Sequence, residues 1–144
     1  MIPVGKGPEA IDLSPDGKEV WTATWGDGGV SIIDVAAKKV VQTLSLHTQR
    51  SNRLKFTLDG KHVLVSDPRG NEVVVLDAAT RKEIKRLKPG KGPTGILMAP
   101  DGSRAYIAAS GDNQLAILDL KTLEFTGRIP TGENPDGMAW VQPR

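Results

Sequence analysis

The sequence contains 144 residues with a formal net charge of +2 and 25% charged side chains, which is a globular composition. No apolar run is long enough to cross a bilayer, and the nearly balanced charge gives no support for a nucleic-acid partner, so we expect neither membrane insertion nor nucleic-acid binding. The absence of cysteine excludes disulfides, thiolate metal sites and cysteine nucleophiles.

A repeat of 42 to 43 residues runs through the sequence. The Asp-Gly pairs that begin at Asp16, Asp59 and Asp101 follow one another at steps of 43 and 42 residues. Aspartates that close apolar runs recur at the same steps. A fixed period in the low forties with strand-like content predicts the four-stranded blades of a β-propeller.

The first unit, residues 8–44, shows what each repeat encodes. We predict four short strands, at 10–13, 19–23, 30–34 and 40–44. The turn between the first two contains Pro15, Asp16 and Gly17, which suit a tight turn because proline presets φ and glycine accepts a positive φ. One such unit forms one antiparallel blade.

Two further units and a stub follow in the same register. We predict a second blade over 51–87, a third over 93–129, and a terminal strand over 135–141, so the whole chain is one partial propeller. Residues 73–76 are apolar at consecutive positions, which indicates burial on both faces of the sheet. The predicted fold class is all-β, with three blades per chain plus extra terminal strands.

The repeat units resemble the YVTN-type β-propeller repeat. The similarity rests on residues 14–21 and 30–40, and on the linkers at 2–8 and 127–135, whereas residues 47–51 depart from the pattern. The resemblance implies a toroidal propeller and a periplasmic or extracellular location, although residues 1–5 show no secretory signal. It implies no single activity, because this fold carries binding modules, surface proteins and enzymes.

Three blades cannot close a propeller ring, which typically has four to eight. An open ring leaves apolar faces at both ends, and each large side chain so exposed forgoes about 1.5–3 kcal/mol of burial. We therefore expect a homodimer, in which two copies supply six blades, or missing blades on another chain. The segments at 2–4 and 138–141 are candidates to bridge the joints.

The loops that vary between units are the candidate binding face, because binding residues concentrate on variable loops held by a rigid scaffold. The linkers between units and the loops between second and third strands share that face. The predicted ligand-binding residues there are Trp25, Asp27, His47, Arg50, Arg53, Asp67, Arg69, Asp112, Asn113, Glu133 and Asn134. No catalytic residue is predicted, since no nucleophile motif is present.

Cofactors receive little support from the sequence. His47 and His62 are the two histidines, too few for a three-histidine metal centre. The loops at 25–29 and 111–113 are rich in glycine and oxygen ligands without EF-hand spacing. We therefore predict no cofactor, with Ca²⁺ as the open alternative and the metal type unknown.

Three functions remain open. The favoured interpretation is a non-catalytic binding or scaffold module for a protein or glycan ligand, and not an enzyme. A second is an isolated or engineered propeller fragment without activity. A third is part of a propeller enzyme, similar to a lactonase, a quinone-dependent dehydrogenase or a heme-bearing reductase, whose chemistry lies outside this chain.

Overall fold

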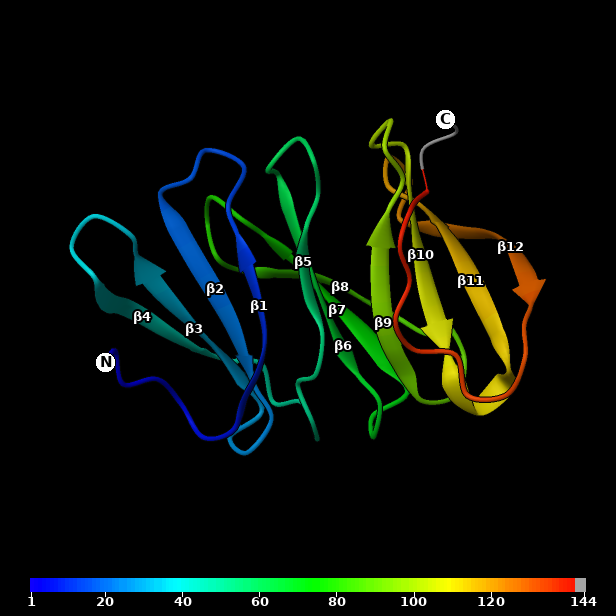
Figure 1. Cartoon of the computed structure of the whole chain (residues 1–144), viewed down its shortest axis with the longest axis horizontal. Helices are drawn as coiled ribbons and strands as arrows, with labels where there is room; N and C mark the ends of the chain where they lie inside the picture. Colours follow the sequence, from blue (N-terminus) through cyan, green and yellow to red (C-terminus); the bar gives the residue numbers. More distant parts are fainter. Residues whose placement is uncertain (142–144) are drawn as a thin grey trace.

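A computed structural model describes residues 1–141 and contains three four-stranded antiparallel sheets, which stand side by side as blades (Figure 1). Each sheet keeps its strands in chain order, from the inner strand outward. The first blade consists of β1 (Pro8–Leu13), β2 (Glu19–Thr24), β3 (Gly29–Asp34) and β4 (Lys39–Ser45). The predicted all-β propeller architecture is confirmed.

The second and third blades repeat this order. The second consists of β5 (Leu54–Phe56), β6 (His62–Asp67), β7 (Glu72–Asp77) and β8 (Glu83–Leu87). The third consists of β9 (Pro93–Met98), β10 (Arg104–Ala109), the 3₁₀ turn η1 (Ser110–Asp112), β11 (Gln114–Asp119) and β12 (Glu124–Pro130). No helix within residues 1–141 is long and apolar enough to span a membrane.

The Asp-Gly turns explain why each blade folds back after its first strand. The Asp16 carboxylate accepts hydrogen bonds from the Ser14 hydroxyl at 2.7 Å and from the Lys18 amide at 3.1 Å. Gly17 has a φ of 72°, and the glycines at the same place in the next two blades have φ of 71° and 72°. A side chain would be strained at these positions, so glycine is favoured at each turn.

The core lies between the blades in two apolar layers. Between the first and second blades, Val30 and Ile32 belong to one buried cluster with Val63. Between the second and third blades, Val75 belongs to another with Ile107. Consecutive apolar residues on β7 therefore serve both layers, because alternate side chains of a strand point to opposite faces.

The terminal segment 135–141 continues the repeat without pairing into a sheet. Trp21 packs edge-on against Phe56 with ring centroids 5.3 Å apart. Tyr106 and Trp140 occupy the same two repeat positions, and their centroids are 5.5 Å apart. The Trp140 indole also donates to the Met98 carbonyl at 2.6 Å. The segment therefore lies against the third blade where the first strand of a fourth would lie, beside β9 in Figure 1.

Candidate functional site

The linkers between blades contact the loops that join the second and third strands. The Trp25 amide donates to the Gly7 carbonyl at 3.0 Å. In the third blade the Gly111 amide donates to the Lys91 carbonyl, also at 3.0 Å. These contacts place linkers and loops on one face of the propeller, which we call the linker face.

Three of the predicted site residues are carboxylates that hold these linkers. Asp27 accepts from the Lys6 amide at 2.9 Å, and Asp112 accepts from the Lys91 amide at 2.8 Å. In each case the oxygen satisfies a backbone donor that the linker cannot pair within a strand. The ligand-binding role of these carboxylates stays a prediction.

Asp67 performs the same task from a different position. Its side chain is 1% exposed and accepts from the amides of Gln49 at 2.7 Å, Arg50 at 3.0 Å and Gly70 at 3.0 Å. It stands three residues before the repeat position of Asp27 and Asp112. The linker at 47–51 lacks the glycine pattern of the other linkers. It is therefore held by a carboxylate at a different repeat position.

Two asparagine side chains extend this pattern. Asn71 has a φ of 56°, and its amide oxygen accepts from the Gly92 amide at 2.8 Å. Asn113 has a φ of 53°, and its amide oxygen accepts from the Asn134 amide at 3.0 Å. Asparagine tolerates this left-handed backbone better than most residues, because its short side chain bonds locally. Asn113 and Asn134 are thus joined by a hydrogen bond from the backbone amide of Asn134 to the side chain of Asn113.

Charged side chains gather where the inner strands begin, and we call Glu9, Trp25, Arg50, Arg53 and Asp136 the charged rim. Glu9 lies 3.7 Å from the Arg50 guanidinium and 3.9 Å from that of Arg53. Arg53 also reaches Asp136 at 3.4 Å. Arg50 lies 5.8 Å from the centroid of the Trp25 ring, which is 47% exposed.

The rim contains one polar atom that no neighbour satisfies. Among the described residues, the buried Nε of Arg50 has no hydrogen-bond partner. An unpaired buried donor costs about 1–3 kcal/mol. This unpaired donor singles out Arg50 among the side chains of the charged rim.

The other predicted residues lie apart from this cluster. Arg69 and Glu133 are exposed and form no ion pair with any residue in 1–141. His47 is exposed, has a φ of 53° and lies 3.5 Å from the Ser45 hydroxyl through Nδ1. Glu9 and Asp136 were not among the predicted site residues, although the two acids share one repeat position in the sequence.

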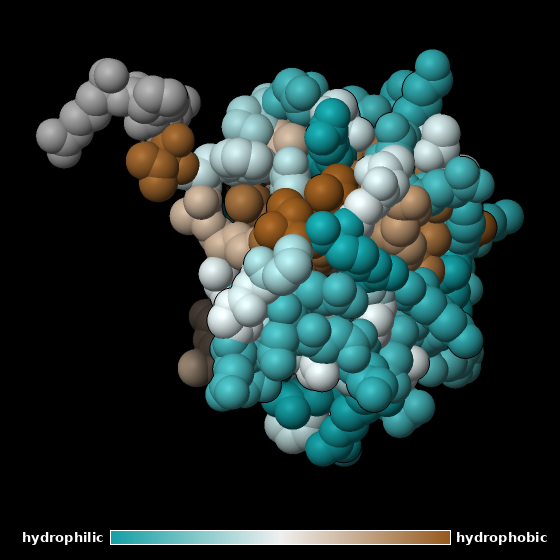
Figure 2. Space-filling view, turned by 90° about the vertical axis from the view of Figure 1, so that its right-hand side faces the viewer, coloured by the Kyte–Doolittle hydropathy of each residue, from teal (hydrophilic) through white to brown (hydrophobic). Residues whose placement is uncertain are grey.

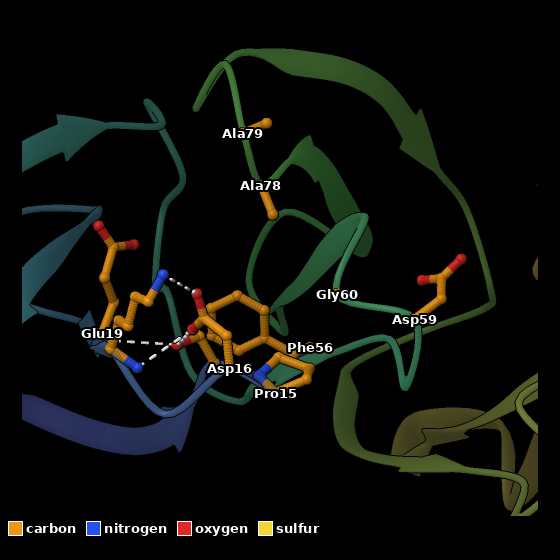
Figure 3. A pocket seen from close by; sticks show the side chains of 10 residues that line it. Pro15, Asp16, Glu19, Phe56, Asp59, Gly60, Ala78 and Ala79 are labelled. Carbon is orange, nitrogen blue, oxygen red and sulfur yellow. Dashed lines mark hydrogen bonds and ion pairs between the residues drawn. The ribbon is translucent and has the colours of Figure 1, made fainter.

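A hollow on the opposite face lies between the Asp-Gly turns of the first two blades (Figure 3). Its polar groups already have partners within the protein. Glu19 pairs with Arg81 and accepts from the Trp21 indole at 2.8 Å. Asp59 accepts from the Thr57 hydroxyl, and this hydrogen bond lowers the pKa of that carboxyl below its usual range. The hollow therefore carries structural hydrogen bonds, and the charged rim is the better candidate site.

Comparisons with known proteins identify a family and a fold. A family model described as the cytochrome D1 heme domain matches residues 3–101. The hydrazine synthase structure from Kuenenia stuttgartiensis is 29% identical, with a TM-score of 0.84 over 92% of this chain and 38% of that chain. The WD40 repeats of RRP9 are 11% identical, with a TM-score of 0.81 over 90% of this chain and 40% of that chain.

A functionally unknown protein from Desulfotomaculum acetoxidans DSM 771 is 18% identical, with a TM-score of 0.77 over 89% of this chain and 44% of that chain. The two more distant likenesses show the propeller fold alone. The chain spans less than half the length of each of these structures. No curated protein sequence matches it.

The family match contradicts the prediction of no cofactor. The matching model describes a heme domain, so heme belongs to the family even though the sequence suggested none. The prediction was wrong because it rested on the scarcity of metal ligands in this chain, which has two histidines and no cysteine. Within residues 1–141, no group of three histidine, cysteine, aspartate or glutamate side chains could hold a metal ion.

Proposed function

Because this chain belongs to the cytochrome D1 heme domain family, we propose that it forms three blades of a heme-domain propeller and binds the carboxylate edge of the cofactor at the charged rim. The observation that carries the proposal is the pair Arg50 and Arg53 at the start of an inner strand, with the Nε of Arg50 buried and unpaired. Three blades are too few for a closed ring, so further blades from another chain or domain complete it.

The residues of the rim fit one part of a heme group. Heme carries propionate carboxylates, and arginine guanidinium groups bind carboxylates through paired, charge-assisted hydrogen bonds. In this structure Glu9 pairs with Arg50 and Asp136 pairs with Arg53, so carboxylates already orient both guanidinium groups. Trp25 adds an exposed aromatic face beside Arg50 on which a planar ring can stack.

The same residues do not supply an iron ligand set. His47 is exposed on the linker face, and His62 begins β6 beside the Asp-Gly turn on the opposite face. In the proposal, iron ligands come from outside this chain. The bound cofactor supplies redox chemistry; the chain binds and orients it, and the periplasm or cell exterior is the proposed location.

A titration with hemin tests the proposal. The Arg50→Ala/Arg53→Ala variant should weaken binding by about tenfold or more, because hydrogen bonds to charged groups contribute about 1.5–3 kcal/mol each. The matched control is Arg69→Ala on the same face, which should bind as the wild type does. Soret absorbance measures binding, and circular dichroism verifies that each variant is folded.

Hemin dimethyl ester separates carboxylate recognition from ring stacking. The ester keeps the ring and iron but lacks free carboxylates, so it should bind more weakly and be insensitive to the two arginine substitutions. The proposal would be contradicted if the double variant lost affinity for hemin and for the ester equally. It would also be contradicted if the double variant bound hemin with wild-type affinity.

A binding module for a protein or glycan is the second candidate. The exposed Trp25 ring favours it, because aromatic faces are common in such sites. In that case a glycan array should show binding that Trp25→Ala abolishes and that the double arginine variant retains.

A further inference from the structure

The third blade presents an uncovered apolar face. Figure 2 shows hydrophobic side chains gathered in the middle of this side of the molecule, with hydrophilic residues around them. The face includes the half-buried Leu115 and Ile117 and the exposed Ile129. Trp140 from the terminal segment covers only its inner edge, against Tyr106.

The repeat register shows what this face is built for. Ile32 in the first blade and Val75 in the second occupy the position of Ile117, and both are fully buried against the next blade. Leu87 is 5% exposed, whereas Ile129 at the same position is 40% exposed. Two joints of the same molecule therefore show that a following blade covers this face.

The first blade of a second copy is a poor candidate for that place. Blades two and three offer Val65 and Ile107 to the preceding blade, and both are fully buried. The first blade has Thr22 at this position and Ser31 on the neighbouring strand, where the second blade has Val74. Both residues are already buried within this chain, so the first blade offers hydroxyl-bearing side chains, and not exposed aliphatic ones, to a docking blade at these positions.

The N-terminal residues already occupy part of the first blade's open face. Ser31 is fully buried, and its hydroxyl accepts from the Gly5 amide at 3.1 Å. A second copy docking there would have to keep or displace this contact.

Charged residues at the outer edge of the blades also disfavour docking of a second copy's first blade. At the first joint, Arg81 of the second blade pairs with Glu19 of the first. The third blade has Arg104 at the position of Glu19, and the first blade has Lys38 at the position of Arg81. Docking a second copy's first blade would place these like charges together, which disfavours the contact.

We propose that the open face of the third blade receives a blade of different sequence, not the first blade of a second copy. That partner carries aliphatic residues at the positions of Thr22 and Ser31 and an acidic residue at the position of Lys38. Segment 135–141 provides its first strand. This inference rests on the proposed continuation of the ring and is independent of the ligand at the charged rim.

Two extensions of equal length test the inference. In both, residues 142–144 are replaced by the last three strands of a blade. One extension copies residues 58–88 with Arg81→Glu and so carries the proposed chemistry. The other copies residues 15–45, with Trp21→Leu and Trp25→Phe in the copied segment so that it adds no tryptophan, and carries the first blade's hydroxyls and lysine.

The first extension should raise the midpoint of thermal unfolding by about 5 °C or more, because it buries a sheet face. It should also protect Trp140 from iodide quenching, measured in a Trp25→Phe background since Trp21 is fully buried. The second extension should produce neither effect.

Three results would overturn the proposal. The first is equal stabilisation by the two extensions. The second is an extension copied from 58–88 that stays unfolded, seen as absent hydrogen-exchange protection. The third is a stable dimer of the wild-type chain, seen as a two-copy mass by light scattering, if Ile117→Asp abolishes that dimer and Arg69→Ala does not. Hemin binding tests the charged rim and not the open face of the third blade. The proposal for the ligand and the proposal for the partner blade can therefore fail independently.

Discussion

The two blade joints each contain a buried apolar layer but differ in their polar contacts. At the first joint, Arg81 pairs with Glu19, and Asp12 receives the Lys55 ammonium at 3.2 Å and the Phe56 amide at 2.9 Å. The second joint is mainly aliphatic. Packing is thus the shared element of the repeat, whereas ion pairs mark one joint.

One polar contact recurs at both joints. Arg86 donates to the Leu46 carbonyl at 2.5 Å, and Arg128, at the same repeat position, donates to the Pro89 carbonyl. Each ties an outer strand to the linker that precedes its blade. Both joints should therefore depend on packing, whereas the first should be the more sensitive to salt.

Removing the largest side chain of the first joint should break it most severely. Trp21→Ala should lower the free energy of unfolding by about 3–5 kcal/mol, because it deletes a fully buried indole and leaves a cavity. Leu64→Ala, at the same repeat position in the second joint, should cost about 2–4 kcal/mol. Urea unfolding measures both, and a larger loss for Leu64→Ala would contradict the ranking.

The linker of the second blade should depend on its carboxylate more than the third does. Asp67→Ala leaves three backbone amides without their acceptor and should cost about 1–3 kcal/mol. Asp112→Ala, whose side chain is exposed, should cost less than about 1 kcal/mol. Hydrogen exchange at Gln49 and Arg50 should accelerate in the first variant. Unchanged exchange at these two amides would argue that the Asp67 carboxylate does not hold the linker.

The ion pair should make the first joint sensitive to salt. Glu19→Gln removes the charge that pairs with Arg81 but keeps an acceptor for Trp21, so it should cost about 0.5–1 kcal/mol at low salt. Added salt should shrink this difference. Glu124→Gln on the exposed part of β12 is the control, and a salt-independent difference would exclude an ionic contribution.

Protonation of the turn carboxylates should have the smallest effect. The Thr57 hydroxyl lowers the pKa of Asp59 below 3.8. A depressed folded-state pKa contributes stability that is present above the unfolded value and is lost as pH falls through the folded value. The free energy of unfolding should therefore decline below pH 3.8, and Thr57→Val should weaken that decline. An NMR titration of Asp59 that Thr57→Val leaves unchanged would contradict this.

The fold could be predicted because its causes are local and repeat. Gly17 and its equivalents mark the turns, and runs such as 73–76 mark strands buried on both faces. The site could be predicted less well. Asp27 holds a linker through a backbone amide 21 positions away, and backbone partners leave no sequence signature. Arg53 meets Asp136 across 83 positions, which depends on how the blades are arranged around the centre.

The second blade holds its linker with Asp67, three residues before the repeat position of Asp27 and Asp112, and this difference limits how repeats can recombine. Each linker directly precedes the blade whose carboxylate holds it, so exchanging a blade together with its preceding linker keeps the pair together. A crossover between residues 50 and 67 would combine a linker of one type with a carboxylate placed for another. The two segments must therefore change together in evolution to keep the linker hydrogen-bonded.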